Sequence, residues 1–139
     1  MVSLSATAAL QLPVRLHGIQ LGRPTDVLLD LESWQAVGYV VRCGDDSTRF
    51  LPYAACQTTT TEIAVQSALM LLEDVAFYEK RGSSFRSLLG GSVAGGGELR
   101  DVVLGNAGAI TELDVEESGE RRRVPAAGRR VVATRASAA

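Results

Sequence analysis

Few side chains of the types that perform catalysis stand in a pattern that would let them act together. His17 is the only histidine in the 139 residues. A histidine-dependent triad and a multi-histidine metal site are therefore excluded within one chain. No serine lies in a Gly-x-Ser-x-Gly motif, the local signature of a nucleophile elbow. We expect no catalytic residue and interpret His17 as a turn or partly buried histidine.

Carboxylates and glycines could instead hold a cation or a phosphate group. Asp26 and Asp30 would share one face of a strand with Glu32 close by, but a hard-metal site needs several oxygens that converge from a suitable loop. The glycine cluster from Gly90 to Gly97 is not followed by Gly-Lys-Ser/Thr, and no helix is expected to begin there. We expect no metal and no cofactor, and interpret the cluster as an inter-strand loop.

The two cysteines, Cys43 and Cys56, are too few and too far apart in sequence for a metal site or a disulfide scaffold. Free cysteine is among the most buried residue types, so two small buried thiols are the favoured interpretation. A disulfide stays open if their strands are neighbours, although a reducing cytoplasm argues against it.

Arginines near the C-terminal end are the best indication of an acidic partner such as RNA. They stand at positions 121–123, 129–130 and 135. The formal net charge of −2 gives no overall attraction to nucleic acid or to an anionic membrane, and no stacking aromatic residues accompany the arginines. Arg122, Arg129 and Arg130 are the candidates for contact with a partner.

A predicted hairpin gives two further arginines partners inside the chain. Ser118-Gly119 is a good two-residue turn. With that loop, Glu116 faces Arg121. Asp114 then faces Arg123, so charges of opposite sign meet across the strands. This register favours a solvated, internally paired surface over one that binds nucleic acid.

Aromatic side chains mark the remaining candidates for partner binding. Trp34 lies in an expected turn, and Tyr78 and Arg81 belong to the stretch 74–81. That stretch predicts one or two helical turns ended by a glycine. We expect the helix to dock Phe77 against the body of the protein while its charges face water.

The elements that must position these residues are mostly strands. An apolar fraction of 46% with 22% charged residues is ordinary for a globular protein. Residues 1–9 are small and polar, and we expect them to be frayed. Period-two patterns and β-branched runs predict strands at residues 10–16, 26–31, 36–42, 48–53, 99–104, 108–115 and 129–134.

Part of this pattern occurs twice. The stretch from Leu21 to Ala55 returns in shorter form from Gly96 to Ala127. Short strands, glycine-marked turns and a final hydrophobic-Pro pair recur in both copies, which predicts two small barrels. The matching segments are Asp26 to Leu29 with Asp101 to Leu104, Gly38 to Val40 with Gly108 to Ile110, and Leu51-Pro52 with Val124-Pro125.

The order of these motifs resembles the PRC-barrel family, which includes the cytoplasmic part of the photosynthetic reaction-centre H subunit and the C-terminal domain of the ribosome-maturation factor. The resemblance implies a mostly β fold of two tandem small barrels, at residues 10–82 and 83–135, with a short helix near their junction. The second copy departs from the pattern, because Gly105 stands where the first has Asp30. Its barrel is therefore expected to be incomplete or to borrow a strand.

The resemblance also implies an assembly or docking module with no shared catalytic residues. We therefore expect a non-enzymatic protein that binds a protein partner, with a homodimer through exposed strand edges as a further expectation. A ribosome- or RNA-associated factor is the alternative. A third is small-ligand binding or hydrolysis at the interface of the repeats. A poor signal peptide and the absence of about eighteen uninterrupted apolar residues predict a cytoplasmic protein without membrane insertion.

Overall fold

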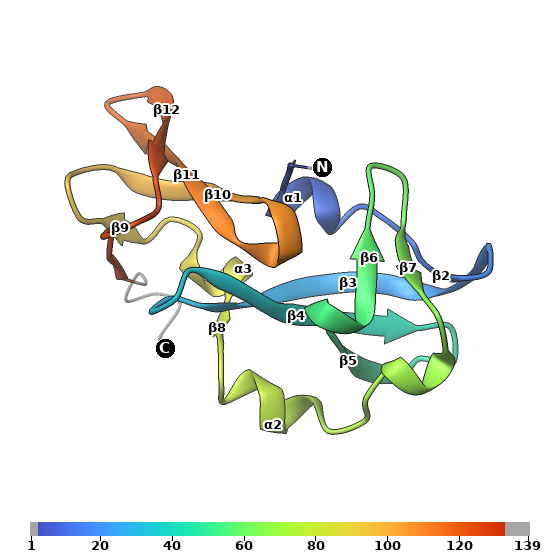
Figure 1. The fold of residues 1–139 in the computed structure, drawn as a ribbon. Helices are drawn as coiled ribbons and strands as arrows, with labels where there is room; N and C mark the ends of the chain where they lie inside the picture. Colours follow the sequence, from blue (N-terminus) through green and yellow to red (C-terminus); the bar gives the residue numbers. More distant parts are fainter. Residues whose placement is uncertain (1–2, 133–139) are drawn as a thin grey trace.

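The computed structural model describes residues 3–132 and shows a mostly β protein, 51% strand and 17% helix, with two sheets (Figure 1). The strands are β1 (Leu4–Ser5), β2 (Val14–Leu16), β3 (Ile19–Asp30), β4 (Gln35–Cys43), β5 (Thr48–Pro52), β6 (Cys56–Thr58), β7 (Ile63–Val65), β8 (Ser83–Ser84), β9 (Ser92–Val93), β10 (Glu98–Leu104), β11 (Ile110–Glu117), β12 (Glu120–Pro125) and β13 (Val131–Val132). The helices are α1 (Ala6–Ala9), α2 (Val75–Glu79) and α3 (Phe85–Leu88), with 3₁₀ turns η1 (Tyr53–Ala55), η2 (Ala68–Met70) and η3 (Asn106–Gly108).

The first sheet runs in the order β5-β4-β3-β2-β7-β6, with β8 added beside β3. Its longest strand, β3, pairs antiparallel with β4, whereas β2 and β7 are parallel. The continuous apolar run at the end of β3 is buried, as expected for a strand covered on both faces, and Val27 and Leu29 are fully shielded from solvent.

The second sheet runs β12-β11-β10-β9-β13, with β1 added beside β10. Its β11–β12 hairpin has the register predicted from the sequence: Glu116 lies opposite Arg121, and Asp114 lies opposite Arg123. The expected ion pairs were wrong, because Arg121 reaches diagonally to Asp114 and Arg100 of β10 contacts Glu116. Ser118 and Gly119 both have left-handed backbone conformations, with φ of 56° and 83°, as a tight two-residue hairpin turn requires. One of the two sheets curls into a half-barrel.

Two short segments cross between the sheets. Residues 4–9 (β1 and α1), which we name the N-terminal hook, pair with β10 through Leu4 opposite Leu104. Residues 83–88 (β8 and α3), the central hook, pair with β3 through Ser83 opposite Leu29. In Figure 1 the dark-blue N-terminal hook lies beside the orange β10, and the yellow central hook lies beside the blue β3. The strands that follow the N-terminal hook belong to the first sheet, but the hook itself joins the second. The strands that follow the central hook belong to the second sheet, but that hook joins the first.

An aspartate on each sheet holds the hook that arrives there. The Oδ1 atom of Asp101 accepts hydrogen bonds from the backbone N–H of Thr7 at 3.2 Å and of Val102 at 2.8 Å. In the first sheet, the Oδ1 atom of Asp26 accepts from the N–H of Arg86 at 3.2 Å and of Val27 at 2.8 Å. The two sites are equivalent, so the internal repeat extends to the hooks.

A serine starts the helix of each hook. Ser5 and Ser84 are the N-cap residues, and their hydroxyl oxygens accept from the N–H of Ala8 at 3.1 Å and of Ser87 at 3.2 Å. These bonds satisfy donors that a short helix leaves free at its first turn. The expectation that residues 1–9 are frayed was wrong for those described, because the hook buries Ala6 and Ala9 completely.

The largest hydrophobic cluster contains residues of both sheets and both hooks, including Ala6, Leu51, Phe85 and Leu113. The proposed ranges 10–82 and 83–135 stay a prediction, and positions 133–135, with Arg135 and the end of the last expected strand, lie outside the described residues. No helix among residues 3–132 is long and apolar enough to cross a membrane.

Candidate functional site: a neutral cleft between the sheets

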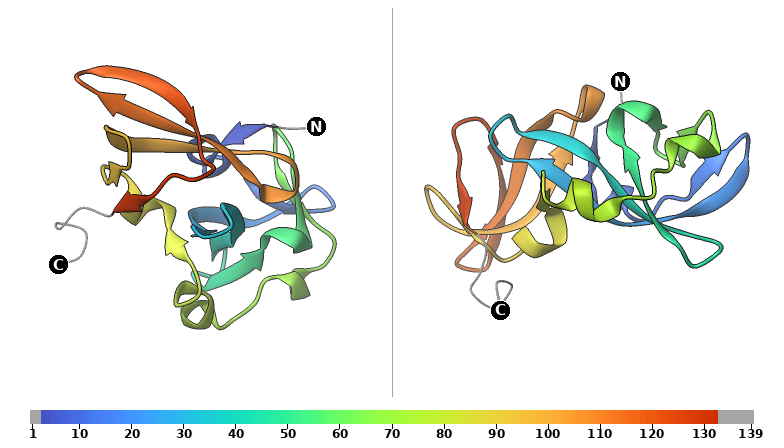
Figure 2. Two further views of the ribbon diagram at one scale, coloured as in Figure 1. Left: turned by 60° about the vertical axis from the view of Figure 1, so that its left-hand side comes forward. Right: turned by 90° about the horizontal axis from the view of Figure 1, so that it is seen from below.

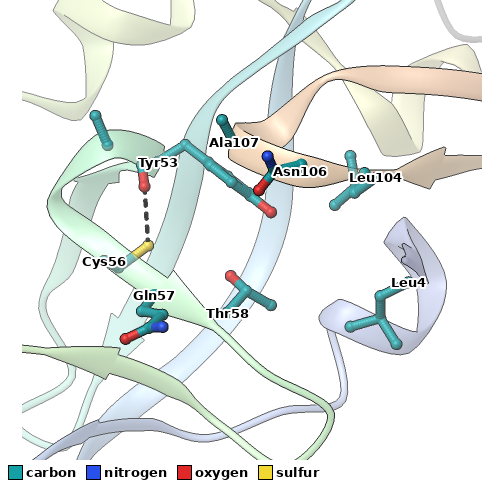
Figure 3. Close-up of a pocket in the computed structure, with 10 residues that line it drawn as sticks. Leu4, Tyr53, Cys56, Gln57, Thr58, Leu104, Asn106 and Ala107 are labelled. Atoms are coloured by element: carbon teal, nitrogen blue, oxygen red, sulfur yellow. Dashed lines mark hydrogen bonds between the residues drawn. The ribbon is translucent and has the colours of Figure 1, made fainter. Parts of the chain in front are cut away.

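A cleft of about 510 Å³ opens where β6 of the first sheet faces the end of β10 and η3 of the second (Figure 3). We name it the junction cleft. Its volume falls within the range of about 300–1,000 Å³ that is typical of ligand sites. The lining residues are Leu4, Tyr53, Ala54, Cys56, Gln57, Thr58, Leu104, Gly105, Asn106 and Ala107.

The first wall is built on the turn that follows β5. Pro52 precedes the 3₁₀ turn η1, which brings Tyr53 to the cleft. The Tyr53 ring stacks on the ring of Tyr39, with centroids 5.6 Å apart, and the Tyr39 hydroxyl hydrogen-bonds the Thr58 hydroxyl at 2.9 Å. Gly108 allows the opposite loop to approach, since a Cβ there would lie 2.8 Å from a Tyr53 ring carbon.

The second wall is the loop η3, which the first sheet holds in place. Ala107 has a left-handed backbone conformation with φ of 57°, unusual for a residue other than glycine. Its carbonyl oxygen accepts a hydrogen bond from the Gln35 amide at 2.5 Å. The carbonyl of Trp34 accepts from the N–H of Ile110 at 2.8 Å. Figure 2 shows the β3–β4 turn reaching toward the second sheet, where these bonds form.

The junction cleft carries no charged side chain among its ten lining residues. Burial raises the pKa of the Cys56 thiol to about 12, and that thiol donates to the Tyr53 carbonyl oxygen at 3.4 Å. Burial also raises the pKa of Tyr39, which outweighs the opposing effect of its hydrogen bond to Thr58. Both groups are therefore protonated and neutral near pH 7.

Polar atoms nevertheless remain available in the cleft. The side-chain amides of Gln57 and Asn106 have no hydrogen-bond partner among residues 3–132, and each can both donate and accept. Leu4 adds apolar surface from the N-terminal hook, whereas Leu104 of β10 is only 2% exposed. Such a lining suits an uncharged group that forms hydrogen bonds. It does not suit an anion or a cation, which would lose hydration without gaining a counter-charge.

Three residues predicted from sequence come together elsewhere. Trp34, Arg129 and Arg130 line a second cleft of about 620 Å³ between the β3–β4 turn and β13. Trp34 is only 8% exposed. The Arg129 guanidinium is engaged inside the chain, since it donates to the carbonyl oxygens of Pro125 and Ala94, both at 3.2 Å.

The remaining predicted residues lie apart from that cleft. Tyr78 and Arg81 belong to the α2 region, where the Tyr78 ring stacks on Phe50 with centroids 4.2 Å apart. Arg81 lies over the ring of Phe77, 3.6 Å from its centroid. Phe77 is 42% exposed, so the expectation that it docks the helix was wrong; Tyr78 does so. Arg122 lies on β12 and pairs with Glu117 at 3.4 Å.

The sequence interpretation missed the junction cleft. Tyr53 and Asn106 carry no motif of their own, and Cys56 and Thr58 were not linked to each other or to any residue of the second copy. A signal was present, since residues 53–58 directly follow the repeated hydrophobic-Pro pair Leu51-Pro52. Both cysteines are free thiols and half-buried.

Comparison with known proteins does not assign the chain to a family. A scan against protein-family models finds no match, and a search of curated proteins finds none either. Function must therefore be inferred from the contacts, burial and charge of the described residues.

Proposed function

We propose that this protein is a non-enzymatic interaction module of the PRC-barrel type, and that the junction cleft binds a segment of a protein partner. The observation that most supports this proposal is the lining of the cleft. Both sheets contribute to it, with uncharged hydrogen-bonding side chains and apolar surface. A concave site that offers both hydrogen-bonding groups and apolar surface can hold an extended peptide through its backbone and its alternate side chains.

The internal repeat supports the family assignment. Two of the three recurring motifs occupy equivalent places: Asp26 to Leu29 on β3 corresponds to Asp101 to Leu104 on β10, and Leu51-Pro52 on β5 corresponds to Val124-Pro125 on β12. The match of Gly38 with Gly108 was wrong, because Gly38 lies opposite Leu28 and Pro52, whereas Glu112 lies opposite their counterparts Val103 and Pro125. Equivalent aspartates, Asp26 and Asp101, hold equivalent hooks. These correspondences favour a duplicated small-barrel unit, and the arrangement as two barrels is part of the proposal.

The state of the titratable groups in the cleft supports a binding role over hydrolysis. A thiol nucleophile must be a thiolate, and Cys56 is protonated near pH 7 because its pKa is about 12. No cluster of three or more potential metal ligands occurs in the part of the chain that the structure describes. A general base for either hydroxyl in the cleft is lacking among the ten lining residues.

The ion pairs of the second sheet favour a protein over RNA as the partner. Arg121 pairs with Asp114 at 2.6 Å, and Arg100 bridges Glu98 at 3.0 Å and Glu116 at 3.4 Å. An RNA-binding surface needs an excess of positive charge, whereas these arginines are balanced by carboxylates.

The test is affinity capture from an extract of the source cells, treated with nuclease, with the wild-type chain as bait. Asn106→Trp places a large ring at the mouth of the junction cleft. Thr60→Trp, at the exposed tip of the β6–β7 hairpin and outside the cleft, is the matched control. We expect one protein to be retained by the wild type and by Thr60→Trp, and to be lost with Asn106→Trp.

Two results would overturn the proposal. Retention that nuclease abolishes would favour the RNA-associated alternative. Retention by Asn106→Trp equal to that by the wild type would show that the partner binds elsewhere. Circular dichroism of both variants establishes that each is folded before capture is compared.

A further inference from the structure

We propose that the junction cleft binds an uncharged extended segment, which adds as a strand to the free edge of β6. This inference rests on the proposed function and names the conformation and chemistry of the partner segment. It draws on the sheet topology, the position of the cleft and the neutrality of its lining.

The topology supplies an open edge at the cleft. β6 ends the strand order of the first sheet and has β7 as its one neighbour within residues 3–132. All three residues of β6, Cys56 to Thr58, line the junction cleft. An open edge presents unpaired backbone N–H and C=O groups, and an extended peptide can satisfy them by pairing as a further strand. The Cys56 N–H already donates to the Tyr53 carbonyl oxygen, so an added strand would pair with the other backbone groups along this edge.

The opposite wall lies at a place that would hold such a strand in the cleft. Leu104 and Asn106 face β6 across the space, and Leu4 of the N-terminal hook stands at one end (Figure 3). The amides of Gln57 and Asn106 can hydrogen-bond the peptide backbone or an amide side chain. Alternate side chains of the added strand would point toward opposite walls.

The lining determines the charge of the segment. A Lys, Arg, Asp or Glu side chain inside the cleft would be partly desolvated with no charged partner among the ten lining residues. Peptide groups and uncharged side chains lose less hydration and gain hydrogen bonds. The partner segment is therefore uncharged over the residues that occupy the cleft.

The experiment uses a display library of random peptides of about eight residues, long enough to extend beyond the three residues of β6 on both sides. We expect the full chain to select peptides whose central residues are uncharged. Bound peptide should slow amide hydrogen exchange of Cys56 to Thr58. N-methylation of the peptide backbone should weaken binding about tenfold at every second position and little at the positions between.

A pair of charge variants tests the neutrality. Gln57→Glu introduces a carboxylate into the cleft, whereas Gln20→Glu makes the same change at an exposed position of β3 outside it. We expect Gln57→Glu to weaken binding of a selected peptide about tenfold and Gln20→Glu to leave it unchanged.

The outcomes separate this inference from the proposed function. Failure to select any peptide, a charged consensus, or equal effects of N-methylation at all positions would overturn strand addition. Loss of the captured partner with Asn106→Trp would in each case still support the cleft as a protein-binding site. The opposite result is also informative. If Asn106→Trp retains the partner while N-methylation weakens peptide binding at every second position, the proposed function is overturned, but addition of a peptide strand to β6 remains supported.

Discussion

The N-terminal hook and the central hook hold the two sheets together, and removal of the Asp101 carboxylate tests this by weakening the attachment of the N-terminal hook. Asp101 is 9% exposed and accepts hydrogen bonds from Thr7 and Val102. A hydrogen bond to a charged group contributes about 1.5–3 kcal/mol. Because Ser5 remains the N-cap of α1 in the variant, we expect Asp101→Ala to lower the free energy of unfolding by about 2–3 kcal/mol.

The assay is urea unfolding followed by tryptophan fluorescence. Trp34 is the only tryptophan and is buried in the turn after β3. Its carbonyl oxygen accepts from the N–H of Ile110 in the second sheet, so its fluorescence reports on the contact between the sheets. Glu73→Ala is the control: its ion pair with Arg49 is 3.4 Å long and its side chain is 85% exposed, so the change should be about 0.5 kcal/mol or less.

A particular pattern would refute this reasoning. If Asp101→Ala leaves the Trp34 transition unchanged while circular dichroism shows a separate, earlier transition, the sheets unfold independently. A loss no larger than that of Glu73→Ala would show that the N-terminal hook does not depend on Asp101. One shifted transition seen by both methods is the expected result.

Two further predictions concern pH and the hairpin turn. Because burial raises the folded-state pKa of Cys56 from 9.0 to about 12, its contribution to stability is complete below about pH 9 and is lost as the pH rises toward 12. Urea unfolding between about pH 7 and about pH 11 should show this decline, and Cys56→Ala should make it shallower; an unchanged slope would contradict it. Gly119→Ala should cost about 1–2 kcal/mol, because Gly119 has φ of 83° with open space around it. Gly44→Ala, also in open space but without positive φ, should cost nothing, and equal losses would exclude the conformational cause.

The hairpin and the strand pattern could be predicted because they depend on local chemistry. Ser118-Gly119 fixes a two-residue turn, and that turn fixes which residues face each other on β11 and β12. The buried run at the end of β3 likewise reveals its environment by composition alone.

The hooks could not be predicted in the same way. Ser5 and Ser84 are ordinary N-caps, but nothing local indicates that each helix docks on the other sheet. That choice depends on Asp101 and Asp26, which lie 94 and 60 residues from the backbone groups they bind. The junction cleft was missed for the same reason, since its two walls come from residues far apart in the sequence, 53–58 and 104–107.

Of the candidates for partner binding, Trp34, Arg129 and Arg130 share a cleft, whereas Tyr78 and Arg122 serve contacts within the chain. The difference has a physical cause. Aromatic and arginine side chains are as useful for packing and internal pairing as for recognition, so their type alone does not distinguish the two uses.

Hydrogen exchange of the chain with and without its captured partner tests the central claim most directly, because it reports the binding surface residue by residue. We expect the partner to slow exchange at residues 53–58 and 105–107, the two walls of the junction cleft. Slowed exchange confined to β12, or to the α2 region around Phe77, with the junction cleft unchanged, would contradict it.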